Sequence, residues 1–535
     1  MKENPARIRR LFYIVLIVLT IALRLWRIGY APGKGALNQD EAMAGYESWS
    51  LLNYGTDSNG YHNPVYLEAW GSGMNALETY LMMPFIAVLG LNGLSVRLPQ
   101  AVTAVFTILA FYFFVKEMNI KYADFKEKGR DEYSDIALIS AFMLCISPWH
   151  IMMSRWALES NLLPGFVLFG LLFLLKARKN SKWILLSMLF FGLSLYAYAV
   201  SWIMLPVIIF ASLVFLIATK QLKADRYFAA GILILFVLAL PLMLFLLVNK
   251  GYLNEIILPF LSIPKLSMYR GGDIDIKPVN MFKKMEKLLL YLRAPKDDFF
   301  HIIEGYGLYY RISVVFQIIG ISAFILRLLR NIKSGDTHFV MGLWFLTAFA
   351  AALTVGINAN HINMLHIPMI YFTAYGIYYL TEHVKKDMII IACIVVYTAY
   401  LASFCGNYFF DYSKKFASEY YLGIDKALEY AKENSEGTIH IRNVYYSNIL
   451  YSLKFDTSEF LATVEYEGSD TKYRRAVSFG RFDLRDYYSE INNKSDLKKG
   501  DAYVVTAKDG EAVELFKNLG LEGVAFENSI VYLVK

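Results

Sequence analysis

The chain has little cysteine and lacks the motifs of several enzyme classes. Of its 535 residues only three are cysteines, Cys145, Cys393 and Cys405, and no two have CxxC spacing. The sequence therefore offers neither a disulfide framework nor a cysteine metal site. It also contains no GxxxxGK[ST] loop, no HExxH and no GxSxG. These absences disfavour ATP hydrolysis, zinc-dependent proteolysis and serine-hydrolase chemistry.

Charge is also scarce. Charged residues make up 19% of the chain and hydrophobic residues 56%. That balance is too apolar for an ordinary soluble enzyme and is typical of a membrane protein with several spans. Basic cytoplasmic loops account for the formal net charge of +7, so it predicts no nucleic-acid partner.

Apolar runs recur along the first 406 residues. Since a spanning helix needs about 20 mostly apolar residues, the pattern predicts about eleven of them. They lie at residues 11–29, 98–116, 135–153, 161–177, 183–200, 203–219, 227–248, 312–329, 338–356, 362–380 and 388–405. No clean cleavage site follows the first run, so we interpret it as a retained helix and not as a signal peptide.

Basic residues alternate between the connecting loops. Lys and Arg gather at 7–10, 121–130, 176–179, 220–226, 327–333 and 385–386, whereas the short loops 154–160, 200–202 and 357–361 contain one Arg and no Lys. The positive-inside rule then places the N-terminus in the cytoplasm and, with an odd number of spans, the C-terminus outside. The sequence predicts a multi-pass protein of a bacterial plasma membrane.

The expected architecture is a polytopic α-helical membrane domain, residues 1–406, followed by a small extracytoplasmic α/β domain, residues 407–535. Two long outer loops, 30–97 and 249–311, interrupt the membrane domain. Residues 76–91 predict a helix lying along the membrane surface, because Glu78 and Pro84 break the short apolar run. In the tail, helical patterns at 418–434 and 511–519 alternate with strand patterns at 438–441, 502–506 and 529–533.

Two neighbouring acids, Asp40 and Glu41, follow the first span by about ten residues. Carboxylates so close to lipid are costly unless they have a function. Such a group can act as a general base on a hydroxyl or amine, or bind a divalent metal. Alternatively, the pair only keeps the loop in water.

Further candidates lie in the outer loops. His62, Glu68 and Glu78 accompany aromatic residues suited to a sugar ring, and His62 and Glu68 are alternatively metal ligands. Arg155 and Glu159 are spaced i, i+4, so on a helix they share a face, as a structural ion pair or as groups lining the outer cavity. His361, in the polar run 358–363, either presents an imidazole to a phosphate or helps to turn the chain. Arg270 is a cation available for a phosphate.

Three segments resemble the GT-C glycosyltransferases that use polyprenyl-phosphate sugars, such as the protein O-mannosyltransferases and the bacterial aminoarabinose lipid A transferases. They are Asp40-Glu41, then Ser95-Val96-Arg97-Leu98-Pro99 at the start of a span, and Ser154-Arg155 with Glu159-Ser160-Asn161. The resemblance covers about residues 10–400. This chain departs from the family pattern at His361, where related sequences often have Arg, and at Glu159, where they often have Asp.

The resemblance implies a sugar transferase, with a polyprenyl-phosphate sugar as donor and a glycan, lipid or protein as acceptor. It implies that Asp40 is the catalytic base, that Glu41 orients the acceptor or shapes the site, and that the reaction inverts the anomeric centre. No nucleotide is needed, and a divalent metal is compatible but not implied. Two alternatives stay open: a transporter or flippase of lipid-linked glycans, and a surface-binding protein whose active part is the tail.

Overall fold

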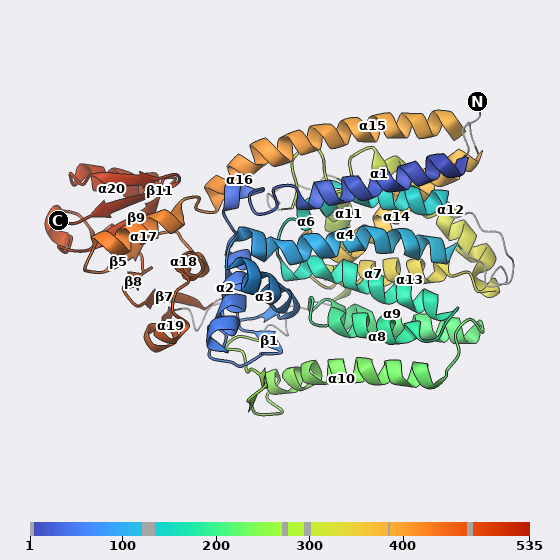
Figure 1. Cartoon of the computed structure of the whole chain (residues 1–535), viewed down its shortest axis with the longest axis horizontal. Coiled ribbons are helices and arrows are strands. Elements are labelled where there is room, and N and C mark those ends of the chain that lie inside the picture. The colour runs from blue at the N-terminus through green and yellow to red at the C-terminus, as the bar shows by residue number, and fades with distance from the viewer. Residues whose placement is uncertain (1–4, 120–133, 270–276, 294–300, 384–385, 468–473) are drawn as a thin grey trace. The chain divides into compact units, whose positions relative to one another are not determined.

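A computed structural model describes residues 5–119, 134–269, 277–293, 301–383, 386–467 and 474–535 (Figure 1). These residues fall into two compact units. The helical unit contains Met1–Trp26, Gln100–Met243 and Gly271–Asn407, and the mixed unit contains Arg27–Pro99, Leu244–Arg270 and Tyr408–Lys535.

Every predicted span contains a helix. These helices are α1 (Pro5–Leu25), α4 (Gly93–Met118), α5 (Asp135–Ile146), α6 (Pro148–Met153), α7 (Glu159–Ala177), α8 (Trp183–Ser194), α9 (Ser201–Ala218), α10 (Arg226–Asn249), α12 (Ser313–Asn331), α13 (His338–Ala352), α14 (Asn363–His383) and α15 (Lys386–Gly406). Pro148 separates α5 from α6, because proline favours the first position of a helix and lacks the N–H that would continue the preceding one. A further helix, α11 (Pro278–Arg293), lies in the second outer loop predicted from the sequence.

Six helical segments of the described residues are long and apolar enough to cross a membrane. They are Gly93–Met118, Glu159–Ala177, Ser201–Ala218, Arg226–Asn249, Ser313–Ser334 and Met388–Asn434. The helices α5, α8 and α13 are equally apolar but shorter. The chain is thus a multi-pass membrane protein.

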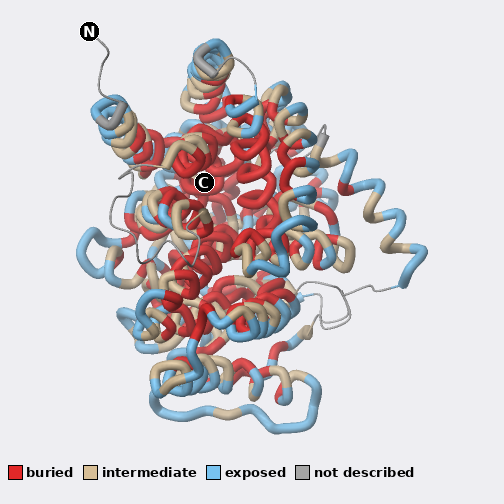
Figure 2. Tube along the Cα trace, turned by 90° about the vertical axis from the view of Figure 1, so that its right-hand side faces the viewer, coloured by how far each residue is buried: buried red, intermediate tan, exposed pale blue. Residues whose placement is uncertain are grey.

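Helix α14 lies at the centre of the helical unit, where α5, α7, α12, α13 and α15 pack against it. In Figure 2 buried residues, drawn red, run along the inner helices. The most apolar stretch of α7 is 83% buried, whereas those of α10 and of the segment that begins with α15 are only 22% and 11% buried. Large apolar side chains are exposed on α10, such as Leu233 and Phe236, and on α15, such as Met388 and Ile391, as lipid contact requires.

Two glycines allow α12 and α14 to approach closely. A Cβ atom on Gly320 would lie 1.9 Å from the Phe372 carbonyl oxygen, and one on Gly376 would lie 2.0 Å from the Phe316 carbonyl oxygen. Small residues at helix crossings let backbones meet in membrane proteins, where no hydrophobic driving force joins the helices.

The mixed unit begins with two helices, α2 (Gln39–Tyr54) and α3 (Leu77–Leu89), which pack on each other. Two short hairpins follow, β1 (Tyr66–Leu67) with β2 (Met74–Asn75), and β3 (Ile256–Leu258) with β4 (Leu261–Ile263). The α3 helix spans most of residues 76–91, the segment predicted to form a helix along the membrane surface.

The tail forms a seven-stranded sheet in the order β10-β11-β9-β5-β8-β7-β6. Its strands are β5 (Ile439–Ile441), β6 (Glu465–Glu467), β7 (Arg475–Phe479), β8 (Phe482–Asp483), β9 (Ala502–Thr506), β10 (Gly523–Phe526) and β11 (Ser529–Leu533). Only the pairs β5–β9 and β5–β8 are parallel. The helices of the tail are α16 (Ser413–Glu419), α17 (Ile424–Asn434), α18 (Tyr446–Leu453), α19 (Thr457–Thr463) and α20 (Gly510–Asn518).

The strands β5, β9 and β11 and the helices α17 and α20 lie where the hydrophobic pattern predicts them. The pattern does not reveal β6, β7, β8 and β10, nor the helices α18 and α19. All of these elements are short. In addition, β6 and β10 are mostly exposed, so no buried face produces a regular spacing of apolar residues in these two strands.

The close approach of α12 and α14 at Gly320 and Gly376 leads to the first prediction. Replacing Gly376 with Leu forces α14 away from the α12 backbone, and overpacking of this kind costs typically about 1–3 kcal/mol. We therefore expect Gly376→Leu to lower the thermal unfolding midpoint of the purified protein in detergent. As a control, Gly406→Ala should leave the midpoint unchanged, because a Cβ atom there would meet nothing within 4 Å. Equal midpoints for both variants would contradict the close crossing.

Candidate functional site

The acid pair occupies the first turn of α2, and Asn38 caps that helix. The Asn38 Oδ1 atom accepts hydrogen bonds from the backbone N–H groups of Asp40 (3.0 Å) and Glu41 (2.8 Å). In return Glu41 Oε2 accepts from the Asn38 N–H at 3.3 Å, which completes a capping box. The positive end of the helix dipole favours carboxylates at this position.

Glu41 forms a fully buried ion pair with Arg97, at the start of α4. The Arg97 Nε donates to Glu41 Oε1 at 2.7 Å and Nη2 donates to Oε2 at 2.8 Å, and both side chains have 0% exposure. Arg97 also donates to the carbonyl oxygens of Pro32 (2.8 Å) and Ala36 (3.0 Å). The guanidinium group thereby fixes both the acid and the loop that leads into α2.

Asp40, in contrast, is partly exposed. Burial raises the pKa of its carboxyl to about 6, a hydrogen bond with Trp70 lowers it, and the charge of Glu41 raises it further. The Trp70 ring packs edge-on against Tyr445 (5.5 Å between centroids) and Tyr446 (4.9 Å) of the tail. The Asp40 carboxyl therefore combines partial exposure with a pKa raised toward neutral pH.

The tail segment that contains α18 holds α2 in place. Ser447 Oγ donates to the Gln39 carbonyl at 3.0 Å and Asn448 Nδ2 donates to the Leu37 carbonyl at 3.0 Å. Further along, the Tyr46 hydroxyl donates to the Phe455 carbonyl at 2.8 Å. A Cβ atom on Gly45 would lie 2.8 Å from Val96. The acid-bearing helix thus packs against residues before and far after it in the sequence.

A second group of acids lies further along the first outer loop. Glu47 accepts from the Ser58 N–H at 2.8 Å and from the Ser58 hydroxyl, and burial raises its pKa to about 7. Asp57 accepts from the backbone N–H groups of Asn59 and Tyr61. Burial raises the pKa of Asp57 well above its ordinary value, and the charge of Glu47 raises it further. These hydrogen bonds give both acids a clear structural function in shaping the loop.

Glu68 and His62 contact the protein's own groups. Glu68 is buried, pairs with Arg474 (3.3 Å) and accepts from the Ser267 N–H (3.2 Å). It therefore links the first outer loop to the second and to the tail. His62 is exposed, with its Nδ1 atom 2.9 Å from the Gly55 carbonyl oxygen.

Glu78 differs from the other acids. It lies in the first turn of α3 and is 1% exposed, and neither carboxyl oxygen has a hydrogen-bond partner among the described residues. Burial raises the pKa of this carboxyl well above its ordinary value, as does the charge of Glu41. Burial without a hydrogen-bond partner thus disfavours the charged form of the Glu78 carboxyl.

The two candidates Arg155 and Glu159 belong to the helical unit. Residues 154–158 form a turn, and Glu159 begins α7. The condition for the two side chains to share a helical face is therefore not met, because α7 begins only at Glu159. Arg155 donates to the carbonyl oxygens of Leu23 (3.2 Å), Arg24 (2.9 Å) and Trp26 (2.8 Å), so it satisfies carbonyls at the end of α1.

His361 also lies in the helical unit, in the turn before α14. Its N–H donates to Asn358 Oδ1 at 2.9 Å, its Nδ1 atom is 2.8 Å from the Gly356 carbonyl oxygen, and its ring stacks on Tyr198. These contacts stabilise the turn. Arg270 lies outside the described residues.

The acids do not form a metal site. Among the described residues, no group of three or more His, Cys, Asp or Glu side chains is placed to hold a metal ion. Both Glu41 oxygens are already bound to Arg97. Glu41 therefore has no oxygen left for a metal ion, and Asp40 is the only one of the two acids that could offer one.

Two features around the acids were not predicted from the sequence. They are the ion pair of Glu41 with Arg97 and the packing of tyrosines around Trp70, the hydrogen-bond partner of Asp40. Arg97 was part of a recognised motif, and an arginine at the start of an apolar span is itself a signal that a buried partner exists. The tyrosines that flank Trp70 come from residues 445–446, and no local pattern links them to a loop some 400 positions earlier.

The buried pair generates the second prediction. Removing one partner of a buried pair leaves an uncompensated charge, which costs about 3–5 kcal/mol. We expect Glu41→Gln to lower the thermal unfolding midpoint clearly, and Glu41→Met combined with Arg97→Met to recover part of the loss. Glu465→Gln, which removes an exposed partner of Arg485, is the matched control and should have little effect. A midpoint unchanged by Glu41→Gln would show that the pair does not organise this region.

No protein-family profile and no curated protein sequence matches the chain. Solved structures do. ArnT from Cupriavidus metallidurans bound to undecaprenyl phosphate superimposes with a TM-score of 0.51 at 12% identity, covering 99% of this chain and 98% of that one. ArnT in the apo state gives a TM-score of 0.52 at 12% identity, over 98% of this chain and 97% of that one.

A third similar structure is the Archaeoglobus fulgidus oligosaccharyltransferase in complex with Zn and sulfate. Its TM-score is 0.50 at 12% identity, and the match covers 98% of this chain and 73% of that one. At this identity the likeness is one of fold. The chain has the GT-C glycosyltransferase fold that its sequence motifs indicated.

Proposed function

We propose that this chain is a membrane glycosyltransferase that moves a sugar from a polyprenyl-phosphate donor to an extracytoplasmic acceptor, with inversion. The fold supports this proposal, since ArnT of the same fold binds undecaprenyl phosphate. The acceptor is a glycan, a lipid or a protein. We further propose that all of the about eleven predicted spans cross the membrane, that residues 1–406 form the membrane domain and that residues 407–535 form an extracytoplasmic domain. We also propose a cytoplasmic N-terminus and a location in a bacterial plasma membrane.

One observation carries the proposal: Asp40 is a partly exposed carboxyl, with a pKa of about 6, at a helix start anchored by a buried ion pair. A general base works best when its pKa is close to the working pH. Its neighbour Glu41 cannot serve equally well, because both of its oxygens are bound to Arg97. We therefore assign Asp40 as the base and Glu41 as a positioning residue.

The proposed reaction is a single displacement. Asp40 takes the proton of the acceptor hydroxyl, and the acceptor oxygen forms a bond with the anomeric carbon. The bond from that carbon to the phosphate oxygen breaks, and its electron pair leaves with the polyprenyl phosphate. Cations stabilise the charge that develops on the phosphate.

The other candidates keep substrate-binding roles in the proposal, with different support. Glu78 has two free carboxyl oxygens among the described residues, so it suits a hydrogen bond to substrate. His62, which is exposed, and Glu68 belong to the same unit as Asp40. In the helical unit Arg155 is buried and donates to backbone carbonyl oxygens, so its substrate-binding role rests on the sequence resemblance. Glu159 rests on the sequence resemblance, whereas His361 and Arg270 rest on their positions in polar outer segments of the sequence.

The third prediction concerns Asp40→Asn. The amide cannot take a proton, and loss of a general base typically costs 10²–10⁴-fold in rate. We expect transfer from a labelled polyprenyl-phosphate sugar to an acceptor extract, measured in membranes, to fall by at least about 10²-fold. Expression and thermal unfolding should not change. Asp411→Asn, at an exposed acid of the same unit, is the matched control and should retain full transfer.

Three outcomes of this experiment are informative. Undiminished transfer by Asp40→Asn would remove Asp40 from the mechanism. Movement of the lipid across the membrane by the wild-type protein, without any transfer, would favour a flippase. Loss of transfer by both variants would point to a general effect of charge in this unit.

The fourth prediction is a pH profile. Only the ionised carboxylate accepts a proton, and the pKa of Asp40 is raised to about 6. The value of kcat/KM for transfer should therefore fall about tenfold per pH unit below that pKa and reach a plateau above it. The residual activity of Asp40→Asn should lack this acidic limb. An acidic limb centred near pH 4, or one that persists in the variant, would assign the titration to another group.

A further inference from the structure

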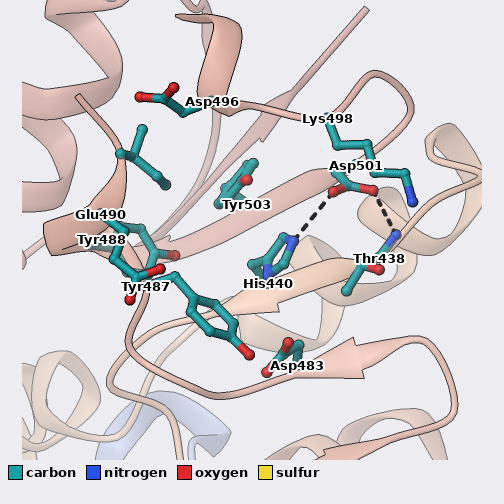
Figure 3. Close-up of a pocket in the computed structure, with 11 residues that line it drawn as sticks. Thr438, His440, Asp483, Tyr487, Tyr488, Glu490, Asp496, Lys498, Asp501 and Tyr503 are labelled. Carbon is teal, nitrogen blue, oxygen red and sulfur yellow. Dashed lines mark hydrogen bonds and ion pairs between the residues drawn. The ribbon is translucent and has the colours of Figure 1, made fainter. Parts of the chain in front are cut away.

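The tail contains a polar cavity, and neither Asp40 nor Glu41 is among the residues that line it. It has a volume of about 540 Å³, within the range of small-molecule sites. Figure 3 shows that its floor is formed by neighbouring strands of the sheet. The residues that line it are Thr438, His440, Asp483, Tyr487, Tyr488, Glu490, Ile491, Asp496, Lys498, Asp501 and Tyr503.

Strand register places three of the lining side chains in one row. His440 of β5 is paired with Asp483 of β8 on one side and with Tyr503 of β9 on the other. Paired residues of adjacent strands share a face. The row continues to Tyr532 of β11, which α20 covers through Phe516, with 4.7 Å between ring centroids. The cavity lies over the other three residues of the row, Asp483, His440 and Tyr503.

Contacts among the floor residues hold them in place. His440 Nε2 lies 3.3 Å from Asp501 Oδ2, and Asp501 Oδ1 accepts from the Thr438 N–H at 2.8 Å, as the dashed lines of Figure 3 show. The Tyr503 ring stacks on the His440 ring at 4.7 Å, and the Tyr487 ring stands edge-on to it at 6.1 Å. A floor fixed in this way loses little entropy when a ligand binds.

Two lining groups have a buried polar atom without a hydrogen-bond partner among the described residues, the Tyr488 hydroxyl and His440 Nδ1. The Tyr488 side chain is 6% exposed, and its hydroxyl has no hydrogen-bond partner among the described residues. A buried hydroxyl without a partner costs about 1–3 kcal/mol. Because both atoms are covered by protein, a ligand in the cavity reaches them only if neighbouring side chains move.

The charges of the lining residues indicate which class of ligand the cavity binds. Four carboxylates line the cavity, Asp483, Glu490, Asp496 and Asp501, against one lysine, Lys498. This excess of acids repels phosphates and acidic sugars. Carboxylates accept hydrogen bonds from hydroxyls, and tyrosine rings offer apolar faces to the C–H faces of a sugar ring.

We propose that this cavity binds a neutral pyranose saccharide. The proposal does not depend on the transfer reaction, because it rests on residues of the tail alone. If the transfer reaction holds, the cavity would recognise the acceptor glycan.

The test is ligand-observed saturation-transfer NMR on the full-length protein in lipid nanodiscs. The probes are methyl mannoside, methyl galactoside and N-acetylglucosamine, with glucuronate as the anionic comparison. We expect saturable binding of at least one neutral probe and at least tenfold weaker binding of glucuronate. Tyr487→Ala and Glu490→Gln should each weaken the neutral probe at least threefold, and Asp40→Asn should leave its affinity unchanged.

Lys508→Ala is the matched control, because Lys508 is exposed, pairs with Glu419 and does not line the cavity. It should bind the neutral probe like the wild type. Thermal unfolding confirms that each variant is folded. The proposal is overturned if no neutral probe binds, if glucuronate binds equally well, or if both cavity variants bind normally. Loss of binding in Asp40→Asn would also overturn it, because the probe would then occupy the site around Asp40.

Discussion

The buried ion pair between Glu41 and Arg97 is the interaction on which the candidate site depends. It joins the first turn of α2 to the first turns of α4, and Arg97 reaches the carbonyls of the intervening loop as well. A fully buried pair is stable only when geometry and hydrogen bonds compensate the lost hydration. Here the bidentate contact and the capping box supply both. The start of α2, and with it Asp40, is thereby fixed.

Two adjacent acids consequently differ in what they can do. Glu41 is committed to its arginine, whereas Asp40 is partly exposed, has a raised pKa and hydrogen-bonds with Trp70. This difference between the two acids arises from their environments, since the residues are neighbours in sequence. The tail contributes directly, because α18 packs on α2 and the tyrosines before and at its start flank Trp70.

Much of the fold could be predicted from the sequence. Long apolar runs gave a helix in every expected span, and buried strands such as β9 were visible as unbroken apolar runs. Short polar strands such as β8 were not, because they carry no period. Asp40 stood out through its position after a span. The contacts of Glu41 with Arg97 and of Glu68 with Arg474 depend on distant residues, which no local pattern reveals. The helix on which Arg155 and Glu159 would share a face is not formed, because α7 begins only at Glu159.

The central claim is that Asp40 is an accessible carboxyl whose proton is lost near neutral pH. Direct titration tests it: carbon-13 NMR of the aspartate carboxyl groups in the full-length protein, with the Asp40 signal assigned by its absence from Asp40→Asn. The account predicts an inflection at a pH of about 6. An inflection at the ordinary aspartate value, near pH 3.9, would contradict it.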